Sequence, residues 1–246
     1  MIVRFESGLI TVVDVRTKII ATIGPSSLEY SVLEQLVEEG MDFIRINTSY
    51  GDHKQYDLIL GNLNNVPKKK EIQTILDIKS MKAIDYALKN DIKMIALSFA
   101  EESYQVEKIR QEVADAFVIS KIESERGVEN FDAILDASDG IMVARGDLGV
   151  AVSLEKVPPL QKEFTIKTLK KGKFLVTATE MLLSMVDNPK PSRAEVSDVA
   201  NAVFDNSSAV MLSEETAIGK HPVEAVKMMR KIIYEAEKWS SKNTFC

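Results

Sequence analysis

Cysteine is nearly absent from this chain of 246 residues, which contains a single one at its last position, Cys246. One thiol cannot form an internal disulfide, so the sequence excludes a disulfide-stapled fold and favours a reducing, cytoplasmic location. No run reaches the roughly 18 apolar residues of a membrane-spanning helix. Met1–Gly24 also lacks the basic start and apolar run of a signal peptide. We therefore expect neither membrane insertion nor secretion.

Positive charge is in deficit, because 31 lysines and arginines stand against 37 aspartates and glutamates, for a net charge of −6. Nucleic acid is thus disfavoured as a partner, since its phosphate backbone attracts basic surfaces. The basic runs Lys68–Lys70 and Lys170–Lys171 are short, and we interpret them as a solvated loop and a helix end. Small molecules are the expected partners, and the oligomeric state stays open, a homo-oligomer included.

A Gly-x-Gly-x-x-Gly turn is missing after the first apolar run, which weighs against an open doubly wound sheet. Eight short apolar runs are present instead, each followed by a helical pattern, and such runs are typical of parallel strands covered on both faces. Eight strand–helix units in a chain of this length predict an α/β fold, a single-domain (β/α)8 TIM barrel over residues 1–246. The predicted strands are Thr17–Gly24, Phe43–Ser49, Ile72–Ile78, Met94–Phe99, Phe117–Glu123, Gly140–Asp147, Phe174–Glu180 and Ala209–Glu215.

Local signals mark two helix starts and the two chain ends. Ser192 with Glu195 predicts a capping box, and Pro222 is placed where the first residue of the last helix is expected. Residues 1–15 are predicted to form a hairpin that closes the barrel bottom. Residues 237–246 are predicted to be a frayed polar tail.

Polar residues stand at the end of every predicted strand, and in a barrel of this kind chemistry occurs at those ends. A solvated rim is the alternative interpretation. The set comprises Thr22, Arg45, Asn47, Ser49, Asp77, Lys79, Ser98, Lys121, Glu123, Arg145, Asp147, Thr179, Glu180, Ser213 and Glu215.

Lys121 and Glu123 are two residues apart on one predicted strand, so both side chains point the same way. Asp147 ends the next strand, and two carboxylates on neighbouring strand ends suit a Mg²⁺ ion that retains water. A divalent ion beside a lysine is suited to stabilising an enolate oxygen. A simple Lys121–Glu123 salt bridge is the alternative. Gly146 and Gly149 flank Asp147 and allow backbone amides to approach an anion, here a substrate carboxylate.

Arg45, Asn47 and Ser49 alternate along the second predicted strand and therefore share one direction. Together with Asp77 on the third strand they place three oxygen-bearing side chains near one arginine. Such a cluster is suited to a hard cation and a phosphoryl group, with Arg45 on the phosphate. His53 and His221 lie outside the strand ends, and each is expected to be exposed or to cap a helix.

These motifs together resemble the barrel domain of pyruvate kinase, and the resemblance covers nearly the whole chain. The family's lid and C-terminal domains have no counterpart in the sequence. The matching segments, in chain order, are Thr17–Ser27, Arg45–Gly51, Ser120–Glu123, Ile141–Gly149, Ala178–Leu182, Ser192–Glu195, Ser197–Val203 and Met211–Ala217.

The resemblance implies a glycolytic transferase that acts on phosphoenolpyruvate and ADP, with Mg²⁺ (or Mn²⁺) and K⁺ as cofactors. It implies that Glu123 and Asp147 bind the divalent metal and that Lys121 stabilises phosphoryl transfer and the enolate. Arg45 would contact phosphate, and Ser213 would belong to a proton relay at the enolate carbon. Metal and substrate carboxylate would be held by Thr179 and by the backbone of Ala144, Arg145, Gly146 and Asp147. The potassium ion would be surrounded by Asn47, Ser49, Asp77 and the carbonyl of Ile78.

The sequence also departs from the family pattern on the nucleotide side. The family inserts its lid after the third strand, but here Lys79 is followed directly by Ser80 and the next helical pattern. The missing segment includes a Gly-Pro-Glu-Ile-Arg stretch whose arginine meets phosphate. Tyr50 replaces a histidine, Glu180 replaces a glutamine and Glu214 replaces a glycine. The two glutamates add negative charge where phosphates are expected, which disfavours ADP.

The sequence is compatible with three functions. The first is a minimal pyruvate kinase that moves phosphate from phosphoenolpyruvate to ADP. The second is nucleotide-independent, metal-dependent enolate chemistry, such as oxaloacetate decarboxylation or pyruvate enolisation. The third is a regulatory or scaffolding barrel that only senses a keto acid. The retention of Lys121, Glu123, Asp147, Thr179 and Ser213 weighs against it.

Overall fold

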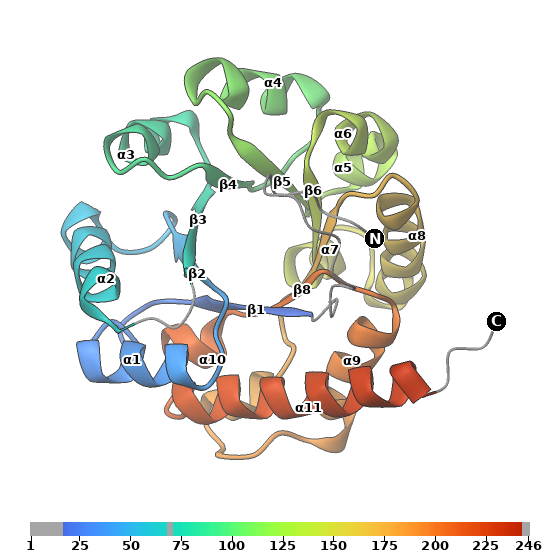
Figure 1. Cartoon of the computed structure of the whole chain (residues 1–246). Helices are drawn as coiled ribbons and strands as arrows, with labels where there is room; N and C mark the ends of the chain where they lie inside the picture. Colours follow the sequence, from blue (N-terminus) through green and yellow to red (C-terminus); the bar gives the residue numbers. More distant parts are fainter. Residues whose placement is uncertain (1–16, 68–70, 243–246) are drawn as a thin grey trace.

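Eight parallel strands close into one barrel with the helices around its outside, in a computed structural model that describes residues 17–67 and 71–242 (Figure 1). The strands follow one another around the ring in chain order, and β1 pairs with β8 to close it. The predicted (β/α)8 barrel is confirmed. The strands are β1 Lys18–Thr22, β2 Phe43–Asn47, β3 Gln73–Ile78, β4 Met94–Leu97, β5 Phe117–Ile122, β6 Gly140–Ala144, β7 Phe174–Ala178 and β8 Ala209–Leu212.

Most of these strands end earlier than the sequence predicted. The largest differences are at β6 and β8. β8 stops at Leu212, and Glu214 and Glu215 lie in the short helix α10 (Glu214–Ala217). β6 stops at Ala144, so that Arg145 and Asp147 lie in the first turn of helix α7 (Arg145–Ala151). The last residue pair between β6 and β7 is Ala144 with Ala178, and the chain becomes helical at the next residue, Arg145. The predicted strand Gly140–Asp147 is therefore three residues too long, and its last residues form a helix that starts at the barrel mouth.

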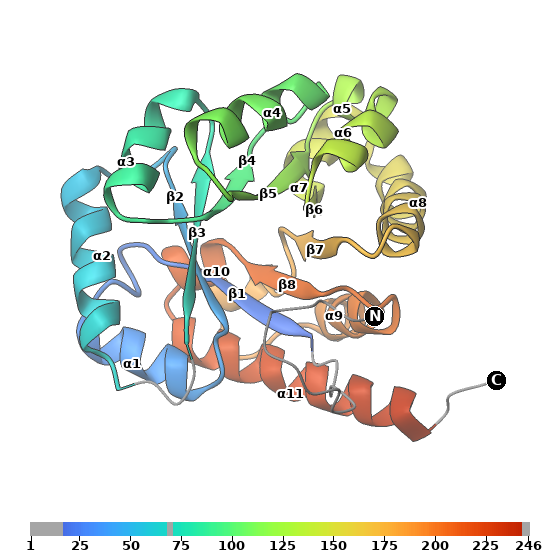
Figure 2. The same ribbon diagram turned by 45° about the horizontal axis from the view of Figure 1, so that its top comes forward.

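Helices cover the whole outer face of the barrel, as the tilted view in Figure 2 shows. The α-helices besides α7 are α1 Tyr30–Glu38, α2 His53–Asn65, α3 Ile84–Lys89, α4 Ser103–Glu112, α5 Glu125–Glu129, α6 Phe131–Ala137, α8 Val157–Lys170, α9 Arg193–Phe204, α10 Glu214–Ala217 and α11 Pro222–Lys242. The described part of the chain also contains the short 3₁₀ helices η1 Met81–Ala83, η2 Leu154–Lys156 and η3 Leu183–Val186. Each long helix buries an apolar stripe against the strands, as Leu33 and Leu36 of α1 do.

The barrel interior is layered from an apolar bottom to a polar mouth. Phe43, Phe117 and Phe174 lie at the strand starts, and Phe174 contacts both other rings edge to face at 6.2 and 6.0 Å between centroids. Above them a buried apolar layer includes Ile75 and Ile119. Because inward-facing residues alternate along a strand, the next inward positions are polar and form the mouth.

Both predicted helix starts are confirmed, and the last helix is longer than expected. Ser192 and Glu195 form the reciprocal capping box of α9, and α11 begins at Pro222. The helix continues to Lys242 rather than fraying after residue 236, and the ring of Trp239 lies 5.2 Å from that of Phe204. The predicted hairpin at residues 1–15 lies outside the described residues.

The third strand connects directly to the third helix. β3 ends at Ile78, and only Lys79 and Ser80 separate it from η1, which leads into α3. No inserted domain stands at this turn, as the sequence indicated. Among residues 17–67 and 71–242, no helix is both long and apolar enough to cross a membrane.

Candidate active site

A buried ion pair joins the second and third strands at the barrel mouth. Arg45 Nε and Nη2 lie 2.8 and 2.7 Å from Asp77 Oδ2, and Nη1 donates to Thr22 Oγ1 at 2.9 Å. Thr22 in turn donates to the carbonyl of Leu212, so the contact spans β8 to β3. The guanidinium is thus fixed on two sides by neighbouring strands, which hold geometry better than loops.

Lys121 joins the same group from the opposite side of the mouth. Its Nζ lies 3.0 Å from Asp77 Oδ2, 2.9 Å from Ser98 Oγ and 2.9 Å from Glu123 Oε1. An ammonium has three donors, so each one has a partner. The prediction that Lys121 and Glu123 share one direction is confirmed, and the salt bridge offered as the alternative is also present.

Glu123 completes a network of four buried charges. Its Oε2 accepts the backbone N–H of Phe99 at 2.8 Å, and its side chain is 1% exposed. Phe99 adopts a left-handed φ of 50°, which turns that amide toward the carboxylate. Sequence reasoning missed this donor, because a main-chain amide leaves no trace in residue identity. Two cations and two carboxylates are therefore neutral as a set, although each is buried.

The two carboxylates of the network respond differently to burial. Burial raises the pKa of Asp77, but the charges of Arg45 and Lys121 with hydrogen bonds from Ser98 and Lys121 outweigh it, so the pKa lies below its ordinary 3.8. Burial dominates at Glu123 and is only partly offset by Lys121 and the Phe99 amide, so its pKa lies above 4.5. Asp77 is accordingly the fixed anion of the group.

Thr179 and Glu180 form an unusual turn directly after β7, with φ of 74° and 56° although neither is glycine. Such left-handed backbone costs free energy in residues with a Cβ, and it persists where surrounding contacts impose it. Here Arg145 supplies those contacts, since Nη2 donates to the Thr179 carbonyl at 2.7 Å and Nε to the Ala178 carbonyl at 3.2 Å. Asp198 of α9 holds the same guanidinium at 2.7 Å.

Arg145 therefore acts on the mouth through Thr179 and not by pointing at a substrate. Gly146 is needed beside it, because a Cβ there would lie 2.8 Å from Thr179 Cγ2. Sequence reasoning assigned the backbone of this segment to substrate and gave no role to the Arg145 side chain or to Asp198. Thr179 and Glu180 form the left-handed turn that Arg145 and Asp198 hold. Threonine and glutamate rarely adopt this backbone conformation, so their identities do not predict the turn.

Replacing Asp198 with asparagine should loosen this turn and lower about tenfold the turnover of the reaction proposed below, because a charged hydrogen bond contributes about 1.5–3 kcal/mol. Arg145→Lys should do the same, since an ammonium cannot reach two carbonyls and a carboxylate as a planar guanidinium does. Steady-state kinetics measure the change in turnover, with the exposed Asp132 of α6 replaced by asparagine as the control. Unchanged kcat in both variants would contradict the positioning role.

Ser213 and Glu215 organise the end of β8. Glu215 is fully buried, and its carboxylate accepts the amides of Ser213 at 2.7 Å and Leu182 at 3.0 Å. Burial raises the pKa of Glu215 above 4.5, with the amides of Leu182 and Ser213 opposing it. Glu215 thereby ties the loop after β7 to the strand that carries Ser213. The sequence placed Glu215 at a strand end without a role.

The predicted magnesium ligands differ in how free they are. Asp147 is exposed in the first turn of α7 and has no hydrogen bond or ion pair within the described part of the chain, whereas Glu123 is engaged by Lys121 and Phe99. No three His, Cys, Asp or Glu side chains of the described residues gather as a metal group. Mg²⁺ is commonly held by one or two carboxylates plus water and substrate oxygens, so the free carboxylate of Asp147 suits that ion. Magnesium binding by Glu123 and Asp147 stays a prediction.

The predicted potassium ligands are neighbours but are already engaged. Asn47 and Asp77 are paired across β2 and β3, and Asn47 Oδ1 accepts the Ser49 amide at 3.1 Å. The Ile78 carbonyl accepts the amide of Ser98 at 2.9 Å. The Asp77 carboxylate faces Arg45, Lys121 and Ser98, which fills its acceptor sites. Asp77 therefore does not fit a potassium ion in this arrangement, and potassium binding stays a prediction.

Comparison with known proteins gives a consistent result for this chain. The family model described as pyruvate kinase, barrel domain, matches residues 14–83 and 65–226. Pyruvate kinase of Dictyostelium discoideum is 44% identical over 236 residues, which is 94% of this chain and 45% of that protein. Pyruvate kinase of Thermococcus litoralis is 48% identical over 179 residues, or 71% of this chain and 38% of that protein.

Pyruvate kinase of Geobacillus stearothermophilus is 43% identical over 334 aligned residues, covering 90% of this chain and 57% of that protein. The chain thus spans about half the length of the relatives it matches. Because the alignment is longer than the 246-residue chain, the relative contains internal residues without a counterpart here. An insertion at the β3 turn accounts for this and for the two-part match that meets at residues 65–83. The chain belongs to the pyruvate kinase family.

Proposed function

We propose that the barrel catalyses phosphoryl transfer between phosphoenolpyruvate and ADP, giving pyruvate and ATP. The observation that carries this proposal is the buried network of Arg45, Asp77, Lys121 and Glu123 at the mouth. Its carboxylates hold two cations in place before a substrate arrives. Positioned cations aimed at developing negative charge are the main requirement of phosphoryl transfer.

In this mechanism Arg45 binds the phosphoryl group of phosphoenolpyruvate, and Lys121 faces the bridging oxygen. When the oxygen–phosphorus bond breaks, that oxygen keeps the electron pair as an enolate, and the phosphoryl group joins the terminal oxygen of ADP. Lys121 stabilises the enolate charge. A proton delivered through Ser213 then reaches the methylene carbon and yields pyruvate. Bound magnesium, held by Glu123 and Asp147, would supply Lewis-acid stabilisation of the same oxygens.

The substrate carboxylate is proposed to lie against the start of α7. Backbone amides of Gly146 and Asp147 are in the first turn of that helix, where amides lack partners within the helix. Thr179 completes this wall, because Arg145 fixes its backbone carbonyl and its Cγ2 faces Gly146. The mouth thereby separates an anion-binding half on β5 to β7 from a nucleotide half on β1 to β3.

The nucleotide half is the weaker one. Tyr50, after β2, is 76% exposed, and no lid rises from the turn at Lys79. A lid normally excludes water and completes the contacts to phosphates. We therefore expect the enolate half-reaction to be more efficient than ATP formation. Every relative named above is a pyruvate kinase, which gives no support to a decarboxylase.

A lactate dehydrogenase-coupled assay with phosphoenolpyruvate, ADP, Mg²⁺ and K⁺ tests the proposed function. The same protein is examined by NMR for Mg²⁺-dependent exchange of pyruvate methyl protons in D₂O. We expect measurable exchange of the methyl protons. We expect ATP formation to be slower than this exchange and not to reach saturation with ADP. Absence of both activities would overturn the proposal, and oxaloacetate decarboxylation without either would replace it.

Replacing a metal-binding carboxylate should weaken divalent-ion binding. Glu123→Gln and Asp147→Asn each remove one charged oxygen, and we expect affinity for Mn²⁺ to fall at least tenfold. Manganese titration followed by EPR measures this loss in the absence of substrate. Asp52→Asn at the start of α2 serves as the control, and unchanged affinity in both site variants would refute the assignment.

A cytoplasmic location is proposed with this function, supported by the lone cysteine and by the substrates that it implies. Small molecules are the proposed partners.

A further inference from the structure

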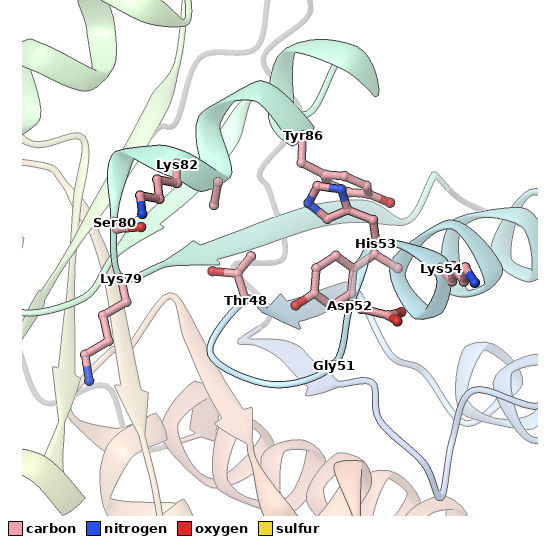
Figure 3. A pocket seen from close by; sticks show the side chains of 11 residues that line it. Thr48, Gly51, Asp52, His53, Lys54, Lys79, Ser80, Lys82 and Tyr86 are labelled. Carbon is pink, nitrogen blue, oxygen red and sulfur yellow. The ribbon is translucent and has the colours of Figure 1, made fainter.

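The two ends of the barrel differ in polarity. At the mouth, the hollow between the loop after β2 and the turn after β3 is lined by polar side chains that include Lys79, Lys82 and His53 (Figure 3). That hollow belongs to the nucleotide half of the proposed active site. At the opposite end, where the strands begin, the barrel interior presents apolar side chains. The two ends therefore suit partners of different chemistry, and the apolar end has no role in the function proposed above.

Four apolar residues form this second end, and we call the surface that they make the barrel floor. Phe43, Met94, Phe117 and Phe174 are the first residues of β2, β4, β5 and β7. Each packs against the apolar layer of the interior but is itself only partly buried. Apolar area that stays in contact with water contributes nothing to stability. The floor can therefore stabilise the fold further once another apolar element covers it.

The described connections at this end are too short to form that cover. Four residues lead from α3 into β4, four from α4 into β5 and two from α6 into β6. Each connection already spans from a helix outside the barrel to the strand that it enters (Figure 1). Eight strands about 4.8 Å apart and tilted by about 36° enclose a backbone ring roughly 15 Å wide. Crossing that ring takes a longer segment than these connections supply.

Residues 1–16 join the barrel at the edge of the floor. Thr17 is buried, and its amide donates to the carboxylate of Glu237 on α11. β1 begins at the next residue, Lys18, and is parallel to both of its neighbours, so the chain before Thr17 enters at the floor end. Residues 1–16, which lie outside the described part of the chain, can reach up to about 50 Å when extended and about 25 Å as a hairpin. Either length exceeds the width of the ring.

The composition of this segment matches an apolar floor. Met1–Phe5 and Leu9–Val13 are rich in β-branched and large apolar residues, and Ser7 and Gly8 stand between them. Two such runs on either side of Ser-Gly are typical of a β-hairpin. Because paired residues of a hairpin share a face and faces alternate along each strand, this pattern predicts one strongly apolar face. Its members are Val3, Phe5, Ile10 and Val12.

Attachment at Thr17 favours this segment over a second molecule as the occupant of the floor. A segment joined directly to the surface that it contacts is present there at an effective concentration on the order of millimolar. A second copy of the chain, or another protein, competes only at a comparable concentration. The tether therefore selects the segment of the same chain.

We propose that residues 1–16 fold back over the barrel floor of their own chain and bury Phe43, Phe117 and Phe174 under an apolar hairpin face. The floor is thus a docking surface, and its occupant is the segment that precedes β1. The hairpin predicted from the sequence thereby has a specific surface to cover. This contact is independent of the proposed phosphoryl transfer, because the floor and the mouth lie at opposite ends of the strands.

Nuclear Overhauser effects (NOEs) between methyl groups of residues 1–16 and the rings of the floor test this contact in the full chain. The sample is deuterated except for the methyl groups of isoleucine, leucine and valine and the rings of phenylalanine. We expect NOEs from the methyl groups of Ile10 and Val12 to the ring of Phe117. Phe131 and Phe164, which stack on each other between α6 and α8, are the control rings and should give none to this segment.

A mixed sample separates a contact within one chain from a contact between copies. It combines equal amounts of chain that has protonated methyl groups and deuterated rings with chain that has the reverse labelling. Only contacts between copies give methyl–ring NOEs in this mixture, and we expect none. NOEs in the mixture would assign the floor to a second copy and overturn the proposal. Absence of NOEs to the floor rings in the first sample would overturn it as well.

Two neighbouring substitutions test the energy of the same contact. Ile10→Lys places a charge on the face that covers the floor, and we expect the equilibrium constant of unfolding to rise about tenfold. Thr11→Lys introduces the same side chain on the opposite face of the predicted hairpin and should change that constant little. Urea unfolding measures both effects, and circular dichroism establishes that each variant is folded.

A floor variant completes the experiment. In Phe117→Ala the ring that Ile10 contacts is missing, so the effect of Ile10→Lys should shrink in that background. Equal effects of Ile10→Lys and Thr11→Lys, or an undiminished effect of Ile10→Lys in Phe117→Ala, would overturn the docking. No substrate or turnover is involved, so failure of the kinase assay leaves these measurements unaffected.

Discussion

Lys121→Met should abolish both pyruvate proton exchange and kinase turnover, with a loss of at least about 10²–10³-fold. Methionine keeps much of the side-chain length but removes the ammonium that faces Asp77, Ser98 and Glu123. Without the ammonium, the negative charge of the proposed enolate oxygen would develop near the carboxylates of Asp77 and Glu123, with no lysine to offset it. The loss should appear in kcat, because the ammonium acts on a charge that forms during the reaction.

The measurement is the exchange of methyl protons in D₂O together with the coupled assay. Lys173→Met is the matched control, since Lys173 is a partly buried lysine that caps α6 by donating to three carbonyls at the opposite end of the barrel. We expect that control to lose stability but to keep exchange. Wild-type exchange rates in folded Lys121→Met would remove Lys121 from the mechanism.

Asp77→Asn should cause the largest loss of stability, roughly 3–5 kcal/mol. The carboxylate is 1% exposed and lies between Arg45 and Lys121, so an amide in its place leaves two buried cations facing each other. Its folded-state pKa is depressed, which fixes the direction of the pH dependence. The stabilisation is fully present above the unfolded-state pKa of about 3.9 and is lost as pH falls through the lower folded-state value.

Urea unfolding at several pH values between 3 and 7 measures this effect. The difference in unfolding free energy between the original chain and Asp77→Asn should be constant above about pH 5 and should shrink toward pH 3. Asp187→Asn removes the carboxylate of an exposed pair with Lys220 and should leave stability nearly unchanged. A difference that grows on acidification would show that Asp77 does not stabilise the fold as an anion.

The fold was predictable from the sequence because its signal is repeated eight times. Every predicted strand overlaps an observed one, since strands buried on both faces require continuous apolar runs such as Ile75–Leu76. The strand ends were less predictable. Residues Arg145 to Asp147 directly follow the apolar run of β6, so the sequence pattern includes them in that strand, but sheet pairing stops at Ala144.

The candidate site was predictable only where side chains alternate along a strand. The shared direction of Lys121 and Glu123 followed from their spacing of two, and Arg45 with Asp77 followed from neighbouring strands. The contacts of Arg145 did not follow, because they end on carbonyls of a left-handed turn made by Thr179 and Glu180. The proposed ligands of magnesium and potassium rest on the family resemblance.

The direct join after β3 also bears on how the barrel is assembled during folding. β4 begins 16 residues after β3 ends, so this pair closes a short loop. Closure entropy rises by about 0.6 kcal/mol for each doubling of loop length, and relatives with an insertion at this turn must close the same pair around many more residues. Lower contact order favours faster folding. The absence of a lid therefore removes a long-range step from the pathway and lets β1 to β4 pair in the order in which a ribosome delivers them.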